Sequence, residues 1–552
     1  MNHELEEQVA AWLAADPDPL DVATLQQLLD EGNEAELQRR FSAPLTFGTA
    51  GLRGPVMAGP AGMNRCTVRR ATQGVAQWLE ESGADCSLGV VVGRDARHGS
   101  EAFNDEVVAV LLGAGIVVHE MPRPLPTPLV AFAVKELRAV AGIMITASHN
   151  PPGDNGYKLF AADGSQIIAP DDATVENGAR TAGTPALGER TSPLHHYLTA
   201  SLLARYRDHF ASRFGVKGGT DFPITYTPLH GVGGVTMMEL FVAAGYRGVN
   251  PVASQFVPDA DFSTLAFPNP EEPGALDLAL AEANATGSSL VVANDPDADR
   301  LGVAVKGREG WRVLRGDEIG WLIASAILED PGAPGNVMAT TIVSSTMLEK
   351  MVEKHWMRFA RTLTGFKWIG RAAGEGILAF GYEEALGYAV DPLVADKDGM
   401  SAALVLCRLA VELDGYGASL LDRLDELEKR YGVHAGCQVA IRAEGDSAMA
   451  TISASVARLL VEPPATLGGQ DVTMVVDLAT GFRGLPPTEG VYLQFGDAGW
   501  VVVRPSGTEP KLKAYFELTP PRDDKMALAP QRAAANIRLT AIAEDLERRL
   551  RL

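Results

Sequence analysis

Leu88-Gly89-Val90-Val91-Val92 begins a pattern that occurs three times in the chain and decides its fold. This apolar run is followed by a polar loop, an amphipathic stretch over residues 101–112 and a second apolar pair, Val117-Val118. The same order begins again at Ile224 and at Val337. Apolar strands that alternate with helices of this length are typical of parallel or mixed sheets joined by right-handed crossovers. The sequence therefore predicts an α/β fold built from three similar units.

Each unit continues into one further strand that ends in a polar loop. The three loops are Thr146-Ala147-Ser148-His149-Asn150-Pro151, Asp295-Pro296-Asp297-Ala298-Asp299-Arg300 and Gly381-Tyr382-Glu383-Glu384-Ala385-Leu386-Gly387. Ligands bind beyond the carboxyl ends of the strands in parallel sheets. We therefore expect the three loops to converge on one cleft.

The last part of the chain has a different pattern. An apolar run over 500–503 leads into Arg504-Pro505-Ser506-Gly507-Thr508-Glu509-Pro510, and a strand-like stretch follows over 512–518. This order is typical of a separate α+β domain. The spacing predicts four domains, at residues 1–205, 206–316, 317–437 and 438–552.

Composition excludes several classes of partner. The 552 residues carry a formal net charge of -22, whereas nucleic acids and anionic membrane surfaces require a basic footprint. No apolar stretch reaches the roughly 18 residues of a membrane span, and residues 1–17 lack the basic start of a signal peptide. We expect a cytoplasmic protein, monomeric or dimeric, whose partners are small molecules.

Ser148 is the candidate nucleophile, because it lies where the apolar run 139–145 ends. A serine at the mouth of a strand can carry a phosphate, with His149 and backbone N–H groups beside it. The alternative is a turn or a helix cap, since Ser and Asn often have that role before Pro.

Asp295, Asp297 and Asp299 form the candidate metal site, because three carboxylates at alternate positions suit a hard divalent cation. A calcium loop of the EF-hand type needs Gly at position 6 and Glu at position 12, where this chain has Arg300 and Lys306. A solvated acidic turn would leave the three carboxylates to repel one another. The pattern therefore favours Mg²⁺, with a further oxygen from the phosphate on Ser148.

Two loops are candidate phosphate sites. Arg504, Ser506, Gly507 and Thr508 offer a guanidinium, two hydroxyls and backbone N–H groups, which suits a phosphate that is not transferred. An ordinary turn at the end of a strand is the alternative. In the glycine-rich stretch 47–54, Arg53 is placed to face the transferring phosphate.

Acidic and basic side chains elsewhere suggest sugar contacts and proton transfer. Glu383 and Glu384 are candidate acceptors for sugar hydroxyls, although paired glutamates are more often a solvated face. The candidate proton shuttles or phosphate clamps are Lys158, Lys367 and Lys397, and exposed lysines are otherwise ordinary surface.

The chain resembles the α-D-phosphohexomutase family of phosphoglucomutases and phosphomannomutases over nearly its whole length. Four loops carry the resemblance, at residues 146–151, 295–300, 381–387 and 504–510. The resemblance implies four domains around a central cleft, a phosphorylated Ser148, and Mg²⁺ bound by Ser148, Asp295, Asp297 and Asp299. It places Lys158, Lys397 and Arg53 in catalysis and Glu383 at the sugar hydroxyls. The other substrate contacts that it implies are Thr49, His149, Arg300, Thr364, Gly365, Lys367, Arg504, Ser506, Gly507 and Thr508.

One position departs from the family pattern. Ala385 stands where many members have serine in the sugar loop, and the loop sequences are most similar to the second-type phosphoglucomutases. We expect a mutase that interconverts hexose 1-phosphate and hexose 6-phosphate, with glucose as the first candidate sugar and mannose as the second, and with a sugar 1,6-bisphosphate as primer. The alternatives are a phosphopentomutase, a hexose-bisphosphate synthase, a metal-dependent sugar phosphatase and a catalytically silent binding protein.

Overall fold

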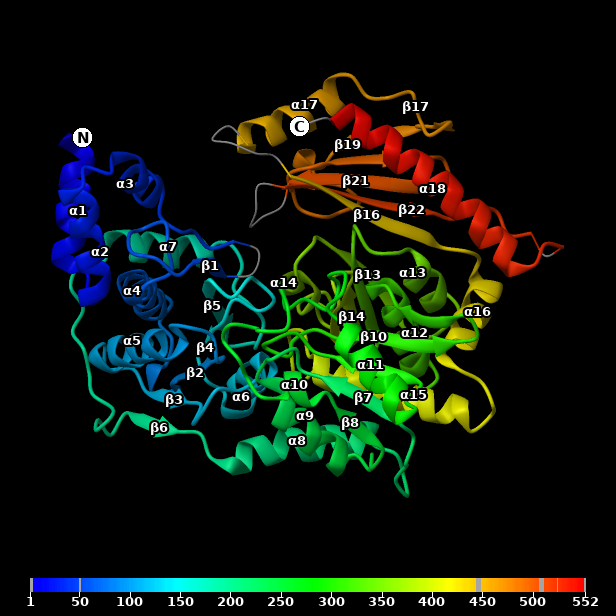
Figure 1. Ribbon diagram of the computed structural model, residues 1–552, viewed down its shortest axis with the longest axis horizontal. Helices are drawn as coiled ribbons and strands as arrows, with labels where there is room; N and C mark the ends of the chain where they lie inside the picture. Colours follow the sequence, from blue (N-terminus) through cyan, green and yellow to red (C-terminus); the bar gives the residue numbers. More distant parts are fainter. Residues whose placement is uncertain (1–2, 49–50, 443–447, 506–510, 524, 551–552) are drawn as a thin grey trace. The chain divides into compact units, whose positions relative to one another are not determined.

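The computed structural model describes residues 3–48, 51–442, 448–505, 511–523 and 525–550. The chain divides into two compact units. Their helices and strands are labelled in Figure 1. Unit 1 comprises Met1–Leu314 and Leu386–Arg408, and unit 2 comprises Arg315–Ala385 and Leu409–Leu552. Within the described ranges, no helix has both the length and the apolar character needed to cross a bilayer.

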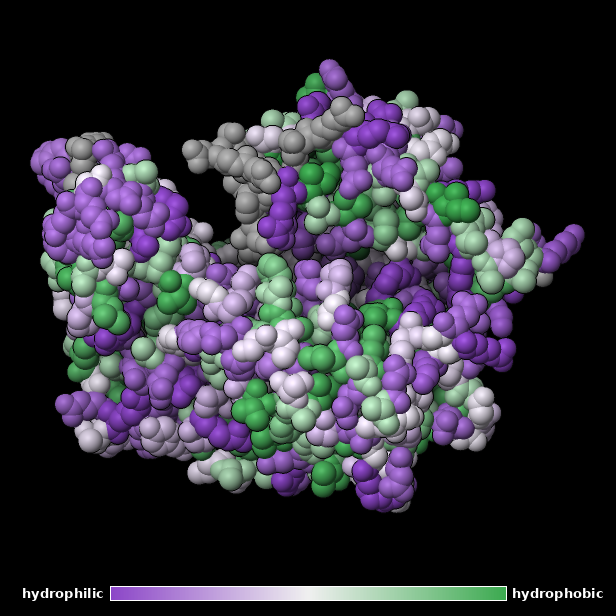
Figure 2. All heavy atoms as spheres, viewed as in Figure 1, coloured by the Kyte–Doolittle hydropathy of each residue, from purple (hydrophilic) through white to green (hydrophobic). Residues whose placement is uncertain are grey.

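Three helices begin unit 1: α1 (His3–Ala15), α2 (Pro19–Asp30) and α3 (Glu34–Phe41). The side chains of Asp18 and Asn33 cap α2 and α3 by accepting hydrogen bonds from backbone N–H groups. Their apolar faces form a small cluster that includes Leu5, Val9, Trp12, Leu25 and Leu37. The outer surface of α1 and α3 is mostly hydrophilic (Figure 2).

The first sheet of unit 1 has the strand order β1-β5-β4-β2-β3-β6. Its strands are β1 (Leu52–Pro55), β2 (Val90–Arg94), β3 (Val118–Glu120), β4 (Ala141–Ile145), β5 (Asp154–Ala161) and β6 (His195–Tyr197). The strands β2, β3, β4 and β6 are parallel, whereas β5 is antiparallel to both of its neighbours, β4 and the edge strand β1. The helices that accompany them are α4 (Arg65–Glu81), α5 (Ser100–Gly113), α6 (Thr127–Leu137) and α7 (Asp171–Thr181).

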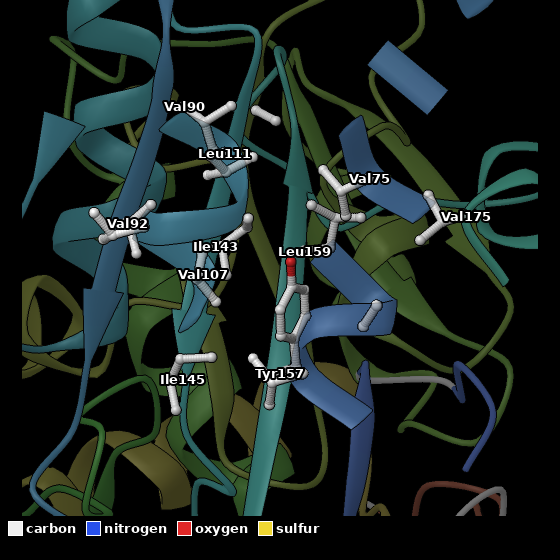
Figure 3. Packing of buried hydrophobic residues seen from close by; sticks show 14 of the residues in the cluster. Val75, Val90, Val92, Val107, Leu111, Ile143, Ile145, Tyr157, Leu159 and Val175 are labelled. Carbon is white, nitrogen blue, oxygen red and sulfur yellow. The ribbon is translucent and has the colours of Figure 1, made fainter. Parts of the chain in front are cut away.

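Side-chain alternation in this sheet explains which residues enter the core. Successive side chains of a strand point to opposite faces. Tyr157 and Leu159 of β5 pack with Ile143 of β4 and with Leu111 of α5, all within one buried cluster (Figure 3). Lys158, between the two apolar residues, therefore points to the other face of the sheet.

The second sheet of unit 1 has the order β11-β10-β9-β7-β8. Its strands are β7 (Ile224–Thr227), β8 (Val249–Pro251), β9 (Leu290–Ala293), β10 (Gly302–Gly307) and β11 (Gly310–Val313). The strands β7, β8 and β9 are parallel, and β10 is antiparallel to β9. The associated helices are α8 (Ala200–Phe214), α9 (Gly233–Ala243), α10 (Ala253–Phe256) and α11 (Asp277–Thr286). The segment Leu386–Arg408 also belongs to unit 1; it contains β15 (Gly387–Ala389), which is not a strand of this sheet, and the start of α15 (Gly399–Asp414).

Unit 2 begins with three parallel strands in the order β13-β12-β14. They are β12 (Val337–Thr341), β13 (Arg358–Thr362) and β14 (Leu378–Glu383), and the helices are α12 (Gly316–Leu328), α13 (Met347–Val352), α14 (Phe366–Ile369) and α16 (Leu420–Tyr431). The strand β14 extends to Glu383, so the loop predicted from Gly381 begins later than expected. Ladder pairing with β12 reaches Tyr382 and keeps these residues in the sheet.

The last sheet of unit 2 is antiparallel, in the order β16-β22-β21-β20-β19. Its strands are β16 (Ala435–Arg442), β19 (Met474–Asp477), β20 (Val491–Gln494), β21 (Gly499–Pro505) and β22 (Lys511–Leu518), with β17 (Thr466–Leu467) and β18 (Gln470–Asp471) as a separate pair. The helices α17 (Ala448–Val461) and α18 (Leu528–Leu550) belong to the same part. Arg504 lies in β21 opposite Lys513 and Pro505 lies opposite Leu512, so the first two residues of the predicted phosphate loop belong to a strand.

Two apolar clusters hold this last sheet. One lies between the sheet and its helices and includes Ile452, Val501, Phe516 and Leu539. The other contains Val502 and Tyr515 from the sheet together with Ile342, Val343 and Leu363 from the first part of unit 2. The two parts of unit 2 thus share a hydrophobic core.

Candidate active site

Ser148 lies just after β4 in a strained backbone conformation. Its φ is 55°, in the left-handed region that costs a residue with a β-carbon roughly 1–2 kcal/mol. The Ser148 N–H donates to Thr146 Oγ1 at 2.9 Å, which closes a tight turn. Ser148 Oγ donates to Asp295 Oδ2 at 2.7 Å, and the side chain is fully buried. The predicted nucleophile and the predicted metal loop therefore meet directly.

His149 lies beside the Ser148 hydroxyl, with its Nδ1 3.2 Å from Ser148 Oγ. Burial lowers the pKa of His149 well below its usual value, and the nearby Arg300 and Arg53 lower it further. The ring is therefore neutral near pH 7, and a neutral imidazole has one nitrogen that can accept a hydrogen bond.

The three aspartates occupy the turn between β9 and the antiparallel β10. Asp295, Asp297 and Asp299 are buried, and one carboxylate oxygen from each lies within 4.8 Å of the others. Between them, Ala298 has a φ of 58°, which turns the chain so that the three side chains converge. The neighbouring loop can approach because Gly231 has no side chain: a β-carbon there would lie 2.3 Å from the Pro296 Cα.

Electrostatics differ among the three carboxylates. Burial raises the pKa of Asp295 well above its usual value, and repulsion from Asp297 and Asp299 raises it further. Burial opposes ionisation of Asp297 too, but the Lys158 ammonium outweighs it and lowers the pKa of Asp297 below its usual range. A cation beside these groups is therefore what keeps them charged in a buried site.

Lys158 supplies that cation from β5. Its Nζ donates to Asp297 Oδ2 at 2.6 Å and to Asp299 Oδ2 at 2.7 Å, and the residue has no exposed surface. Lys397 Nζ lies 3.5 Å from Asp299 Oδ2 and 3.4 Å from Asp396 Oδ1. Two of the three candidate lysines, Lys158 and Lys397, thus lie at the aspartate cluster as part of its charge balance.

Arg53 and Arg300 approach the same loops. Arg53, on β1, donates from Nη1 to Asn150 Oδ1 at 3.4 Å, and burial followed by repulsion from Arg300 lowers the pKa of Arg53. The Arg300 backbone N–H donates to Asp295 Oδ1 at 3.0 Å, and its guanidinium lies 4.0 Å from Asp299 Oδ1. Two arginines, a histidine and a buried serine therefore border the triad.

The aspartate cluster has the chemistry of a divalent-cation site. Among the described residues, Asp297 Oδ1 and Asp299 Oδ1 are buried and have no hydrogen-bond partner, which is costly for a carboxylate oxygen unless a ligand occupies it. All-oxygen donors of this kind suit Mg²⁺, which is commonly held by a few carboxylates together with substrate phosphate. The residues present therefore fit the predicted metal.

Thr127 also belongs to this site, although the sequence analysis did not identify it. Its hydroxyl donates to Asp297 Oδ2, and its backbone N–H donates to the Asp297 carbonyl oxygen at 2.9 Å. Thr127 is the first residue of α6 and directly follows Pro126. In the sequence, this pattern indicates the start of a helix and gives no sign of a binding site. Only the approach of the two sheets of unit 1 reveals the contact.

The remaining predicted residues lie in unit 2 or outside the described ranges. Glu383 ends β14 and is 8% exposed, and Arg504 is half-buried near the end of β21. The segment 364–367, with a φ of 110° at Gly365, contains the candidates Thr364, Gly365 and Lys367. The other candidates, Thr49, Ser506, Gly507 and Thr508, lie outside the described residues.

Glu384 has buried hydroxyl partners that the sequence did not suggest. Ser344 Oγ donates to Glu384 Oε2 at 2.8 Å, and Thr341 Oγ1 lies 3.4 Å from the same oxygen. Burial, then repulsion from Glu383 and Asp317, raises the pKa of Glu384 to about 7. The carboxyl pair therefore contains one member that can stay protonated near neutral pH.

Comparisons with known proteins agree with this geometry. Four family models match: the alpha/beta/alpha domains I, II and III of phosphoglucomutase/phosphomannomutase at residues 44–185, 204–310 and 315–431, and the C-terminal domain at 468–535. A probable phosphomannomutase of Haemophilus influenzae is 37% identical over 85% of this chain and 96% of its own length. The phosphopentomutase of Mus musculus is 34% identical over 94% of this chain and 91% of its own length.

Solved structures show the same fold. A putative phosphomannomutase from Thermus thermophilus superposes with a TM-score of 0.69 at 23% identity, and covers 92% of this chain and 99% of its own. With all four domains matched in order, the chain belongs to the phosphoglucomutase/phosphomannomutase family of the α-D-phosphohexomutase superfamily, whose members are intramolecular phosphotransferases.

Proposed function

We propose that this phosphomutase interconverts hexose 1-phosphate and hexose 6-phosphate, with glucose phosphates as its main substrates. The 2.7 Å contact between Ser148 Oγ and Asp295 Oδ2 carries the proposal, because it joins a nucleophile to a cluster fitted for a divalent cation. In the resting enzyme Ser148 carries a phosphoryl group. A sugar 1,6-bisphosphate serves both as the primer that installs this group and as the reaction intermediate.

The reaction has two half-reactions. In the first, the bond between phosphorus and Ser148 Oγ breaks while a bond forms to the free sugar hydroxyl; the hydroxyl proton passes to a basic side chain, and Ser148 Oγ takes up a proton. In the second, the bond between the other phosphorus of the bisphosphate and its sugar oxygen breaks while a bond forms to Ser148 Oγ, which loses its proton, and the sugar oxygen takes up a proton to become a hydroxyl. The sugar must bind in two orientations, so both of its ends meet the same serine.

We assign roles to the residues around Ser148 from their contacts. Lys158 is held by two carboxylates, so it orients the aspartates and balances their charge. Lys397 lies farther from the nearest carboxylate oxygen and is the candidate that handles the hydroxyl proton. Mg²⁺, held by Asp295, Asp297, Asp299 and the phosphate on Ser148, would neutralise charge on the phosphoryl group.

A kinetic comparison of three sugars tests the substrate. Glucose 1-phosphate, mannose 1-phosphate and ribose 1-phosphate are assayed side by side with Mg²⁺ and a bisphosphate primer, and their kcat/KM values are compared. We expect glucose 1-phosphate to have the highest value. A mannose preference would correct only the choice of hexose, and a ribose preference would refute the hexose assignment.

A pentose phosphate is the second candidate substrate, for a specific reason. Ala385 removes a hydroxyl from the sugar loop, and the mouse phosphopentomutase is similar over 94% of this chain. The same assay also distinguishes a sugar phosphatase, which would release free phosphate without needing the primer. Phosphate release equal to substrate loss would refute a mutase.

A further inference from the structure

We infer that Arg97 is a positioning residue that holds the loop of Ser148 in its reactive conformation. Arg97 follows β2 and is 4% exposed, although its sequence context suggests a basic loop open to an anionic substrate. The inference rests on the proposed function, because it gives the nucleophile of that function a conformational support.

One guanidinium holds four backbone carbonyl groups of the loop. Arg97 Nη2 donates to the carbonyl oxygens of Ser148 and Asn150, both at 2.6 Å. Arg97 Nη1 donates to those of Pro151 at 2.8 Å and Asp154 at 3.2 Å. The four contacts span the whole turn from the nucleophile to the start of β5, so a displacement of the guanidinium would release the turn at both ends.

The contacts leave the two terminal nitrogens of Arg97 no donor for a phosphate. A guanidinium has five N–H groups, of which four point from the two terminal nitrogens. All four are used on the carbonyl groups. The fifth, on Nε, makes no hydrogen bond, but it is buried and lies 3.4 Å from Asp95 Oδ2. Arg97 therefore acts on the loop and not on the substrate.

The support matters because the loop is strained at the nucleophile. Ser148 has a φ of 55°, and such a conformation persists only where the surroundings fix it. The hydrogen bond to the Ser148 carbonyl oxygen acts on this residue itself. Without it, the backbone can relax and move Ser148 Oγ away from the aspartates.

The position of Arg97 is itself fixed from both sides. Asp95 accepts from the Arg97 backbone N–H at 3.0 Å and from Ser100 Oγ at 2.6 Å, and therefore anchors the loop that carries the arginine. On the other side, Phe262 places its ring 4.8 Å from the Arg97 guanidinium carbon. Phe262 is buried and belongs to the domain that also carries the aspartates. The stack therefore ties the serine loop to the domain of its metal site.

The first test replaces the guanidinium of Arg97 by an ammonium, which keeps the positive charge and removes the planar set of donors. In Arg97→Lys a single ammonium, with three donors, cannot span four carbonyl groups. The readout is the rate at which glucose 1,6-bisphosphate phosphorylates Ser148, followed by intact mass, together with kcat and KM for glucose 1-phosphate. We expect phosphorylation and kcat to fall about 100-fold, as for a misplaced reacting group, with KM unchanged within about twofold. Arg247→Lys, which alters an exposed arginine paired with Asp221, is the control and should match the wild type.

Two further variants keep the inference testable if Arg97→Lys does not fold. Phe262→Leu removes the stack but keeps apolar volume, and should lower kcat severalfold without raising KM. Arg97→Ala should regain activity when millimolar guanidinium chloride is added and should not respond to sodium chloride at equal ionic strength. A purely structural role would give neither the rescue nor a kcat effect at constant KM.

The outcomes separate the inference from the proposed function. A wild-type protein that takes no phosphate from the bisphosphate would refute the proposed function, and the inference with it. A wild-type protein that is phosphorylated, with Arg97→Lys equally fast, would refute the inference alone. A raised KM with an unchanged kcat would also overturn it, because Arg97 would then contact substrate.

Discussion

Glu517 of β22 offers a quantitative test of how the two parts of unit 2 are joined. This carboxylate is buried and accepts hydrogen bonds from Ser345 Oγ at 2.5 Å, from Thr346 Oγ1 at 2.7 Å and from Trp500 Nε1 at 3.0 Å. His434 Nδ1 lies 3.1 Å away. Burial opposes the charge, but the His434 ring and the hydroxyl donors outweigh it and lower the pKa of Glu517 to about 2.

The shift sets the expected magnitude for Glu517→Gln. The pKa falls from 4.5 to about 2, and each pKa unit corresponds to about 1.4 kcal/mol, so the ionised form contributes about 3 kcal/mol at neutral pH. Because the folded-state pKa is lowered, this contribution is present above pH 4.5 and is lost as the pH falls toward 2. The variant should therefore be less stable than the wild type at neutral pH, and the difference should shrink on acidification.

The stability difference is measured by hydrogen exchange with mass spectrometry, which reports the opening of individual segments. A single unfolding transition would be a poor measure, because the chain has several domains. Amides of β22 and of the segment around Thr346 should exchange about 100-fold faster in Glu517→Gln, as expected for a local loss of about 3 kcal/mol. The control is Glu489→Gln, at an exposed position of the same sheet region, which should leave exchange unchanged. Wild-type exchange rates in Glu517→Gln, or equal acceleration in the control, would refute the reasoning.

Three further predictions concern the reaction and its pH dependence. Ser148→Ala should abolish mutase turnover and phosphate uptake measured by intact mass, with an unchanged circular dichroism spectrum, whereas the exposed Ser201→Ala should behave as wild type. Asp297→Asn should lower kcat about 100-fold and remove the rise in melting temperature that Mg²⁺ produces, unlike the exposed Asp277→Asn. Glu384→Gln should melt higher than the wild type above pH 7 and not below pH 4.5, because a raised pKa of about 7 means that stability is lost as the Glu384 carboxyl ionises.

The repeated sheets could be predicted from the sequence because their central strands are fully buried. In runs such as Val90-Val91-Val92, the side chains on both faces of the strand are apolar. This pattern is typical of a parallel strand that is covered on both faces. The loops after β4 and β9 followed from the same pattern, since each apolar run stops where its polar loop begins. The strand ends in unit 2 did not follow, because Glu383 and Arg504 are polar and nevertheless lie in strands.

Contacts that depend on tertiary approach could not be predicted. Thr127 and Arg97 reach the site through atoms that any threonine or arginine has, and nothing in their local spacing marks the partner. Arg97 belongs to a basic stretch of the sequence, and the structure buries it among backbone carbonyl groups of the turn after β4. A count of charges along the sequence does not reveal this contact, because the carbonyl groups come together only in the folded turn.

The contacts between the two sheets of unit 1 are polar, although apolar packing at the same place would be more stable. Ser148 meets Asp295, Thr127 meets Asp297, and Lys158 meets two aspartates, all of them buried. Burying this many charged groups costs several kcal/mol of desolvation for each ion, and replacing a buried ion pair by apolar side chains is often stabilising. Hydrophobic burial is non-directional, whereas each of these contacts fixes a distance between two named atoms. The polar join therefore costs stability, and in return it places the serine hydroxyl within hydrogen-bond reach of the aspartates, which phosphoryl transfer requires.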